Sequence, residues 1–161
     1  MSTTIIRNGL YFDGTGKKGE KKDVVIKNNK IDAVVDKAPA MEGAKEIDAS
    51  GQWVMPGLID IHAHYDAELE VMPGLEESVR HGVTTVVIGN CSLSAALGKD
   101  TEIVDLFARV ENIPAKTLSH WMIGNIKWKN VTEYYEHLDT VPVGPNIASF
   151  LGHSNLRMHV M

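Results

Sequence analysis

The sequence predicts an α/β protein in two parts: a small N-terminal β-sandwich-like unit, then parallel strands that alternate with helices. Two observations support this. Short strand-like segments separated by Asn and Gly turns fill residues 3–53. After them come three apolar segments, Val54–His64, Val83–Ile88 and Ile147–Leu151, with helical patterns between them. Strands alternating with helices are typical of a parallel sheet covered by helices.

The N-terminal part is predicted to consist of short strands joined by tight turns. Asn8-Gly9 and Asn28-Asn29 are turn sequences, because both residue types tolerate left-handed backbone. We assign residues 1–53 to this β unit and residues 54–161 to the following α/β part. The strands are expected at Thr3–Arg7, Leu10–Phe12, Asp23–Lys27, Lys30–Val35, Glu46–Ile47 and Gln52–Val54.

The segment Val54–His64 is predicted to be a strand that ends in two histidines. Alternate side chains of a strand point to opposite faces. One face therefore carries Leu58, Asp60, His62 and His64, and the other carries Ile59, Ile61 and Ala63. Helices are expected to cover the apolar face, so the histidines point inward. Two such residues lie about 6.6 Å apart at Cα, close enough for one cation to bind both.

The second apolar segment, Val83–Ile88, is β-branched almost throughout and is predicted to be a strand buried on both faces. Gly82 before it suits the left-handed end of a short helix. Counting by twos places Cys91 on the face of Thr85, so its thiolate would point inward if the extended geometry continues. Thiolate and imidazole together are typical zinc ligands. The alternatives are a buried cysteine and a hydrogen-bonded histidine pair without metal.

The remaining segments are predicted to be a loop, two helices and a third strand. Ser92–Lys99 is rich in small residues and suits a loop over a site. A helix beginning at Asp100 or Thr101 would pack Ile103, Leu106, Phe107 and Val110. A capping box formed by Asn130 and Glu133 would begin the next helix, with Val131, Tyr134, Tyr135 and Leu138 on its packing side.

Composition restricts the class of protein. The chain has 161 residues, 43% of them hydrophobic, and a net charge of −5, which gives no reason to expect nucleic acid or an anionic membrane surface. The single cysteine rules out an internal disulfide and suits a reducing compartment. We find neither an apolar run long enough for a membrane span nor a signal-peptide pattern. These features favour a soluble, cytoplasmic protein.

The joined motif VMPGLIDIHAHYD resembles the first barrel strand of the amidohydrolase superfamily, which ends in His-x-His. The continuation HGVTTVVIGNCSLS, with FLGHSNLR later, is similar to the N-acyl-D-amino-acid deacylases, or D-aminoacylases. The opening segment NGLYFDGTGKKGEKKDVVIKNNKIDAV also resembles this family. The resemblance implies that residues 54–161 form the first part, about three strands, of a metal-dependent TIM-type β/α barrel.

The resemblance also implies an activity and a set of site residues. The expected reaction is zinc-dependent hydrolysis of the non-peptide amide of an N-acyl-D-amino acid, with one or two divalent ions. His62, His64 and Cys91 would be the metal ligands, Cys91 replacing the bridging lysine carbamate of other superfamily members. Asp60 would orient an imidazole. Apart from the resemblance, the positions of Asn90 and His153 at the C-terminal ends of predicted strands make them candidates for lining the substrate pocket.

The length of the chain qualifies this expectation. A complete eight-stranded barrel takes about 250 residues, so we expect this chain to be a portion whose partner is the remaining half of the barrel or another chain. The catalytic aspartate is expected beyond Met161, and the 161-residue chain alone is expected to be inactive. Two alternatives stay open: a cyclic amidohydrolase of the dihydropyrimidinase or dihydroorotase type, and a non-catalytic fragment with a partial metal site.

Overall fold

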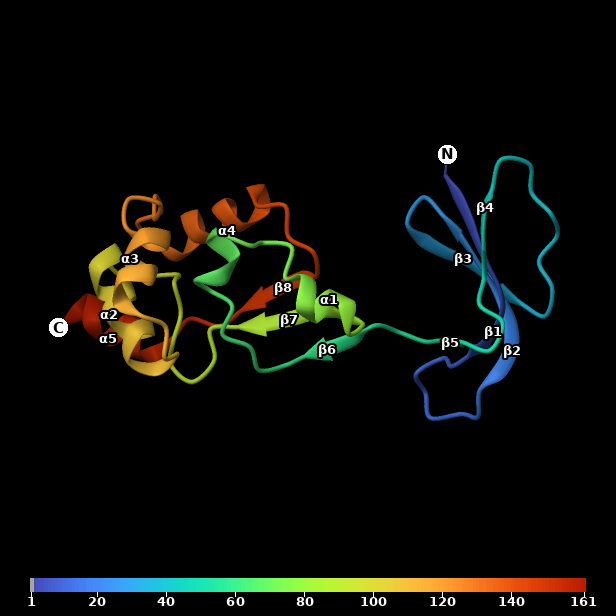
Figure 1. Ribbon diagram of the computed structural model, residues 1–161, viewed down its shortest axis with the longest axis horizontal. Helices are drawn as coiled ribbons and strands as arrows, with labels where there is room; N and C mark the ends of the chain where they lie inside the picture. The colour runs from blue at the N-terminus through green and yellow to red at the C-terminus, as the bar shows by residue number, and fades with distance from the viewer. Residues whose placement is uncertain (1) are drawn as a thin grey trace. The chain divides into compact units, whose positions relative to one another are not determined.

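A computed structural model describes residues 2–161, which divide into two compact units, one ending at Pro56 and the other spanning Gly57–Met161. The first unit is a single five-stranded mixed sheet (Figure 1). β1 pairs with β2 in antiparallel fashion and with β4 and β5 in parallel fashion. Its strands are β1 (Thr3–Tyr11), β2 (Glu20–Lys27), β3 (Lys30–Val35), β4 (Lys45–Asp48) and β5 (Trp53–Val54).

The predicted turn at Asn8-Gly9 is wrong, because β1 runs through it as one strand with a bulge. Asn8 adopts a φ of 62°, and the register with β2 shifts between Ile6 and Gly9. The displaced amide of Asn8 donates to Asp23 Oδ1 at 2.9 Å. A bulge therefore accommodates the left-handed residue without ending the strand. The turn predicted at Asn28-Asn29 is confirmed, since both residues have positive φ between β2 and β3.

A charge network around the buried Asp23 joins the strands of the first unit. Asp23 is buried, and its Oδ2 accepts from Ala38 N at 2.9 Å and from Arg7 Nη1 at 3.1 Å. Arg7 also pairs with Glu46 on β4. Burial by itself raises the pKa of Asp23, but the amides of Asn8 and Ala38 and the Arg7 guanidinium outweigh it and hold that pKa below its usual range.

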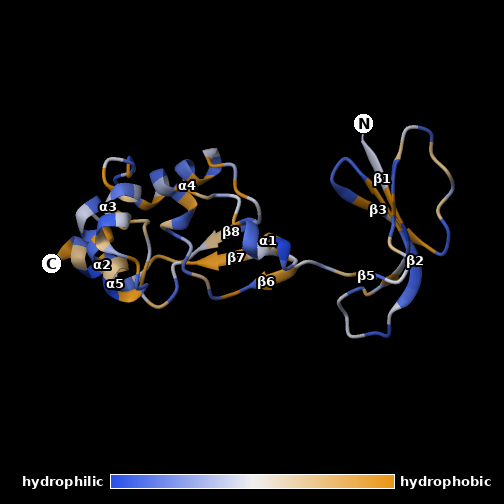
Figure 2. Ribbon diagram, in the orientation of Figure 1, coloured by the Kyte–Doolittle hydropathy of each residue, from blue (hydrophilic) through white to orange (hydrophobic). Residues whose placement is uncertain are grey.

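The second unit contains a three-stranded parallel sheet in the order β6-β7-β8, with helices around it (Figure 1). The strand β7 is the centre of the sheet and its most apolar strand (Figure 2). The strands are β6 (Leu58–Asp60), β7 (Val83–Ile88) and β8 (Asn146–Ser149). The helices are η1 (Glu68–Glu70), α1 (Glu76–Arg80), α2 (Asp100–Val110), α3 (Ala115–Met122), α4 (Val131–Thr140) and α5 (His153–Val160).

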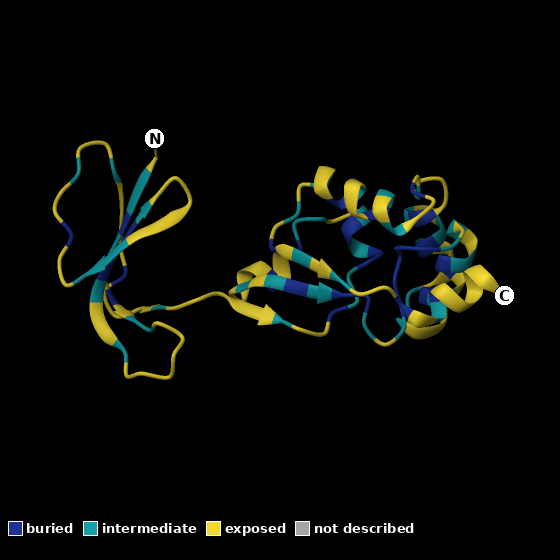
Figure 3. Cartoon of the chain, turned by 180° about the vertical axis from the view of Figure 1, so that it is seen from behind, coloured by how far each residue is buried: buried dark blue, intermediate teal, exposed yellow. Residues whose placement is uncertain are grey.

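Only one face of the sheet is covered. Val86 and Ile88 of β7 are fully buried against the helices, whereas Val83, Thr85 and Val87 on the opposite face are only half-buried, so the prediction that β7 is buried on both faces is wrong. Ile59 pairs with Thr85 on the opposite face and is 62% exposed, and Ile61 is 73% exposed. Figure 3 shows this exposure along β6. The expectation that helices cover Ile59 and Ile61 is therefore also wrong for the described residues.

The first parallel strand is much shorter than predicted. Trp53-Val54 belongs to the first unit, where it pairs with Leu10 and Tyr11. β6 ends at Asp60, and Ile61-His62 forms a bend. The simple alternation expected as far as His64 therefore stops before the histidines, and Ala63 instead enters the helix-covered core at 5% exposure.

The predicted helices α1, α2 and α4 are present, whereas α3 has no predicted counterpart. Asn130 Oδ1 accepts from Glu133 N at 3.0 Å, as the capping box requires, and Tyr134 and Leu138 are buried. In α2, Ile103 and Phe107 are buried but Val110 is exposed. The unpredicted helix is α3, whose short length leaves a weak periodic signal. Among the described residues, no helix combines the length and apolarity needed to cross a bilayer.

Candidate metal centre

Three side chains from the C-terminal ends of two neighbouring strands converge. His62 and His64 follow β6, and Cys91 follows β7. His62 Nε2 lies 3.0 Å from Cys91 Sγ, and the two imidazole rings are 5.2 Å apart between centroids. One potential ligand atom from each residue lies within 4.8 Å of the others. The cluster therefore brings two nitrogens and one sulfur close enough together to bind one ion.

The backbone reaches this arrangement by a turn, not by the extended geometry expected. Gly89, Cys91 and Ser92 have φ values of 76°, 49° and 73°. A Cβ at Gly89 would lie 2.2 Å from the carbonyl oxygen of Phe150, so only glycine fits there. Non-glycine residues with positive φ are uncommon and tend to occur at functional sites. The turn directs Cys91 toward His62.

Asp66 anchors this turn from the side of the histidines. It is 1% exposed; Oδ1 accepts from Ala95 N at 3.0 Å and Oδ2 accepts from Gly89 N at 3.4 Å. Burial raises the pKa of Asp66 to about 6, although the two amides oppose the shift. Our prediction gave Asp66 no role. The sequence does show a carboxylate two residues after His64, which could have pointed to it.

The loop after Cys91 is packed inside the second unit. Residues 93–97 are buried, and Trp128 Nε1 donates to Ala95 O at 2.8 Å. Asn155 is fully buried; its Oδ1 accepts from Ser94 N at 2.7 Å and its Nδ2 donates to Leu97 O at 3.2 Å. Asn155 in the segment GHSNLR therefore holds the loop in place through two hydrogen bonds, a role that no sequence pattern predicts.

The other predicted site residues have different surroundings. Asp60 was expected to orient an imidazole. Its Oδ1 instead accepts a hydrogen bond from the backbone amide of His62 at 3.0 Å. Asn90 Nδ2 donates to Val87 O at 2.7 Å and to Ala63 O at 3.4 Å, joining the ends of the two strands. His153 is the exposed first residue of α5 and is not part of the metal-capable cluster among residues 2–161.

A further carboxylate lies beside the cluster. His64 Nδ1 is buried and has no hydrogen-bond partner among the described residues. Glu111 Oε1, at the end of α2, lies 3.7 Å from it. Glu111 also had no role in our prediction, because the sequence contains no pattern that relates it to His64.

The donor set suits a zinc ion. Ligand atoms around tetrahedral zinc, with nitrogens at 2.0–2.1 Å and sulfur at 2.3 Å, lie roughly 3.4–3.7 Å from one another. The separations in the cluster, 3.0 Å for one pair and no more than 4.8 Å for the others, bracket this range. Imidazole and thiolate favour zinc over the hard cations that prefer oxygen ligands.

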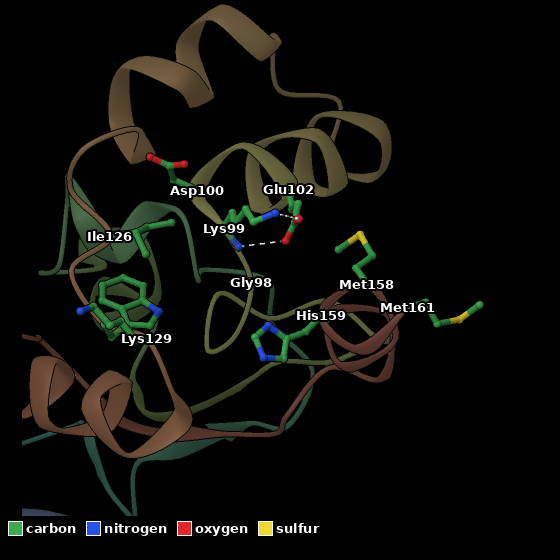
Figure 4. A pocket seen from close by; sticks show the side chains of 10 residues that line it. Gly98, Lys99, Asp100, Glu102, Ile126, Lys129, Met158, His159 and Met161 are labelled. Atoms are coloured by element: carbon green, nitrogen blue, oxygen red, sulfur yellow. Dashed lines mark hydrogen bonds and ion pairs between the residues drawn. The ribbon is translucent and has the colours of Figure 1, made fainter.

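A separate cavity of about 750 Å³ lies between the start of α2 and the end of α5 and shares no lining residue with the cluster. Figure 4 shows Lys99 and Glu102 on one side of it and His159 and Met158 on the other. Lys99 is paired with Glu102 at 3.3 Å. The cavity therefore mixes charges of both signs and offers no cluster of metal-binding groups.

Comparison with known proteins identifies relatives of the whole chain. Residues 45–161 match the pattern of the amidohydrolase family. An uncharacterised protein of Mycobacterium tuberculosis is 47% identical over 158 residues, which are 98% of this chain and 26% of that protein. A solved D-aminoacylase, described as having a binuclear metal centre, shares 32% identity and a TM-score of 0.76 over 98% of this chain and 31% of its own.

A second solved relative is the N-acyl-D-glutamate deacylase of Bordetella bronchiseptica, complexed with zinc and a phosphonate inhibitor. It shares 27% identity and a TM-score of 0.72 over 98% of this chain and 31% of its own. The chain thus spans less than a third of the length of these relatives. The predicted fold class, a small β unit followed by a parallel sheet with helices, is confirmed by its match to the N-terminal part of D-aminoacylase structures.

Proposed function

Because the chain belongs to the amidohydrolase family, we propose that a full-length protein containing these residues is a zinc-dependent deacylase of N-acyl-D-amino acids. The single observation that carries the proposal is the convergence of His62, His64 and Cys91 after β6 and β7. The bond to be hydrolysed would be the amide between the acyl group and the amino nitrogen, which is not a peptide bond. The D-aminoacylase and N-acyl-D-glutamate deacylase relatives support this substrate class.

In this proposal the three residues hold one zinc ion, and a second divalent ion could share Cys91. When bound, zinc supplies Lewis-acid activation of water and of the amide carbonyl. The chain's own contribution is to position the ligands. Asp60 fixes the backbone at His62, and Asp66 fixes the turn that presents Cys91. Asn90 holds the two strand ends together, so ligands from different strands keep one geometry.

The general base that accepts a proton from water is not among these residues in the proposal. Asp66 is buried and bonded to two amides, and Asp60 accepts from the His62 amide. Asp66 is therefore shielded from a substrate, and Asp60 is engaged through one oxygen with the backbone that carries His62. An aspartate outside residues 1–161 is expected to serve instead. Asn90 and His153 remain candidates for lining the substrate pocket.

The test is to assay the full-length protein with N-acetyl-D- and N-acetyl-L-amino acids, using chiral chromatography of the released amino acid. We expect preference for the D enantiomer and loss of turnover when zinc is chelated. Matched assays with a hydantoin and a dihydropyrimidine test the cyclic amidohydrolase alternative. Rapid turnover of a cyclic substrate with no deacylase activity would contradict the proposal.

A further inference from the structure

The strongest unexplained feature outside the three ligands is the buried nitrogen of His64. Its Nδ1 atom has no hydrogen-bond partner among residues 2–161 and is shielded from solvent. A buried polar atom without a partner costs about 1–3 kcal/mol, so such an atom calls for an explanation. The neighbouring carboxylate of Glu111, 3.7 Å away, is the group placed to provide one.

We propose that Glu111 is a positioning residue that accepts a hydrogen bond from His64 Nδ1–H and thereby leaves Nε2 as the metal-binding atom. The proposal rests on the proposed metal centre. Metal-binding histidines commonly donate their other ring N–H to a carboxylate, which fixes both the tautomer and the orientation of the ring. Without such a partner, His64 would be free to present either ring nitrogen.

The location of Glu111 suits this role. Its amide donates to Phe107 O at 2.9 Å, which fixes it at the end of α2, and Phe107 is 1% exposed in the core. Asn112 then adopts a φ of 52°, so the chain leaves the helix immediately after Glu111. The backbone that carries the carboxylate is therefore held in place on the core of the second unit.

We expect the contact between Glu111 and His64 to tighten on metal binding. At 3.7 Å, the pair is outside the 2.7–3.2 Å range of a direct N–H···O hydrogen bond. A side-chain rotation that moves Glu111 Oε1 about half an ångström toward His64 Nδ1 would bring the two atoms within hydrogen-bond distance. Both side chains are about one-fifth exposed, 22% for His64 and 23% for Glu111, so the bond would form in a site partly shielded from water.

The test compares Glu111→Ala and Glu111→Gln with wild type in the 161-residue chain. Zinc affinity is measured by competition with a chelator. We expect Glu111→Ala to weaken zinc binding about 10–100-fold at unchanged stoichiometry. The zinc affinity of Glu111→Gln should lie between those of wild type and Glu111→Ala, because the amide oxygen of glutamine still accepts a hydrogen bond. The control is Glu136→Gln on the exposed side of α4, which should bind zinc like wild type.

A second measurement separates positioning from a general structural effect. Imidazole ¹⁵N shifts report which His64 nitrogen carries the proton, even without metal. We expect the Nδ1–H tautomer in wild type and a shift away from it in Glu111→Ala, with an unchanged thermal unfolding temperature. Wild-type affinity and tautomer in Glu111→Ala would overturn the proposal. Loss of a whole zinc equivalent would overturn it as well, because Glu111 would then be a ligand.

The two proposals can fail separately. If wild type binds no zinc, the metal centre itself is wrong, whereas the tautomer measurement still decides whether Glu111 orients His64. If wild type binds zinc but Glu111 variants match it in both measurements, the metal centre stands and the role of Glu111 fails.

Discussion

At the scale of single residues, the site depends on backbone conformations that few residue types adopt. Cys91 has a positive φ, and Gly89 sits against the Phe150 carbonyl where no side chain fits. This strain is maintained by hydrogen bonds from elsewhere, above all those of Asp66. The position of the Cys91 sulfur therefore depends on the residues that hold the turn as well as on the cysteine itself.

Cys91→Ala should bind zinc more weakly than wild type. The change removes a thiolate ligand while keeping an L-residue at the same φ, so the loss should exceed the about 10–100-fold expected for an outer hydrogen-bonding partner. Cobalt substitution followed by absorbance spectroscopy checks this result, because the thiolate-to-cobalt charge-transfer band should disappear. Ser92→Ala, in the same turn, is the matched control. Retention of the band and of full affinity in Cys91→Ala would exclude the thiolate as a ligand.

At the scale of elements, polar side chains join segments that lie far apart in the sequence. Asn155 connects α5 to the loop after β7 across 61 residues, and His62 meets Cys91 across 29. In the first unit, Asp23 joins β2 to the bulge in β1 and to the segment at Ala38. Each of these groups stabilises an arrangement that no local propensity specifies.

Asp23 should make the first unit sensitive to acid. Its pKa is lowered in the folded state, so its stabilising contribution is complete above the unfolded pKa of about 4 and is lost as the pH falls through the lower folded value. Asp23→Asn should lower the free energy of unfolding by about 1–3 kcal/mol at neutral pH and flatten this acid dependence. Hydrogen exchange of the Ile5 and Val25 amides measures the effect.

The control for Asp23 is Asp36→Asn, which removes only an exposed ion pair with Lys22. Its exchange rates should follow those of wild type at every pH. Equal acid dependence in wild type and Asp23→Asn would show that Asp23 does not account for the transition.

At the scale of the whole molecule, the second unit has a covered face and an exposed one. The helices bury Val86 and Ile88, whereas Ile59 on the opposite face is exposed. The relatives that match the chain are more than three times as long, and the chain aligns with less than a third of their length. The described residues bring together three potential zinc ligands, and the two carboxylates beside them, Asp66 and Glu111, face backbone amides and His64.

The 161-residue chain should therefore bind zinc without hydrolysing N-acetyl-D-amino acids. Hydrolysis needs groups that hold a water, activate it and accept its proton in the same transition state. The described cluster lacks the group that would accept the proton. Zinc titration and amino-acid release are measured on the same sample, with light scattering to record association through the exposed face. Zinc-dependent turnover by the monomer would show that the active site is complete within these residues.

The sequence by itself determined the three strands of the second unit with α2 and α4 between the last two, the turn at Asn28-Asn29 and the identity of the three metal-capable residues. These follow from local periodicity, capping residues and a family resemblance. The tertiary structure decided that β1 continues through Asn8, that β6 stops at Asp60, and that Asp66, Asn155 and Glu111 support the site. Contacts between residues distant in the chain, such as those of Asp66 and Asn155, leave no periodic trace in the sequence, so only the packed fold reveals them.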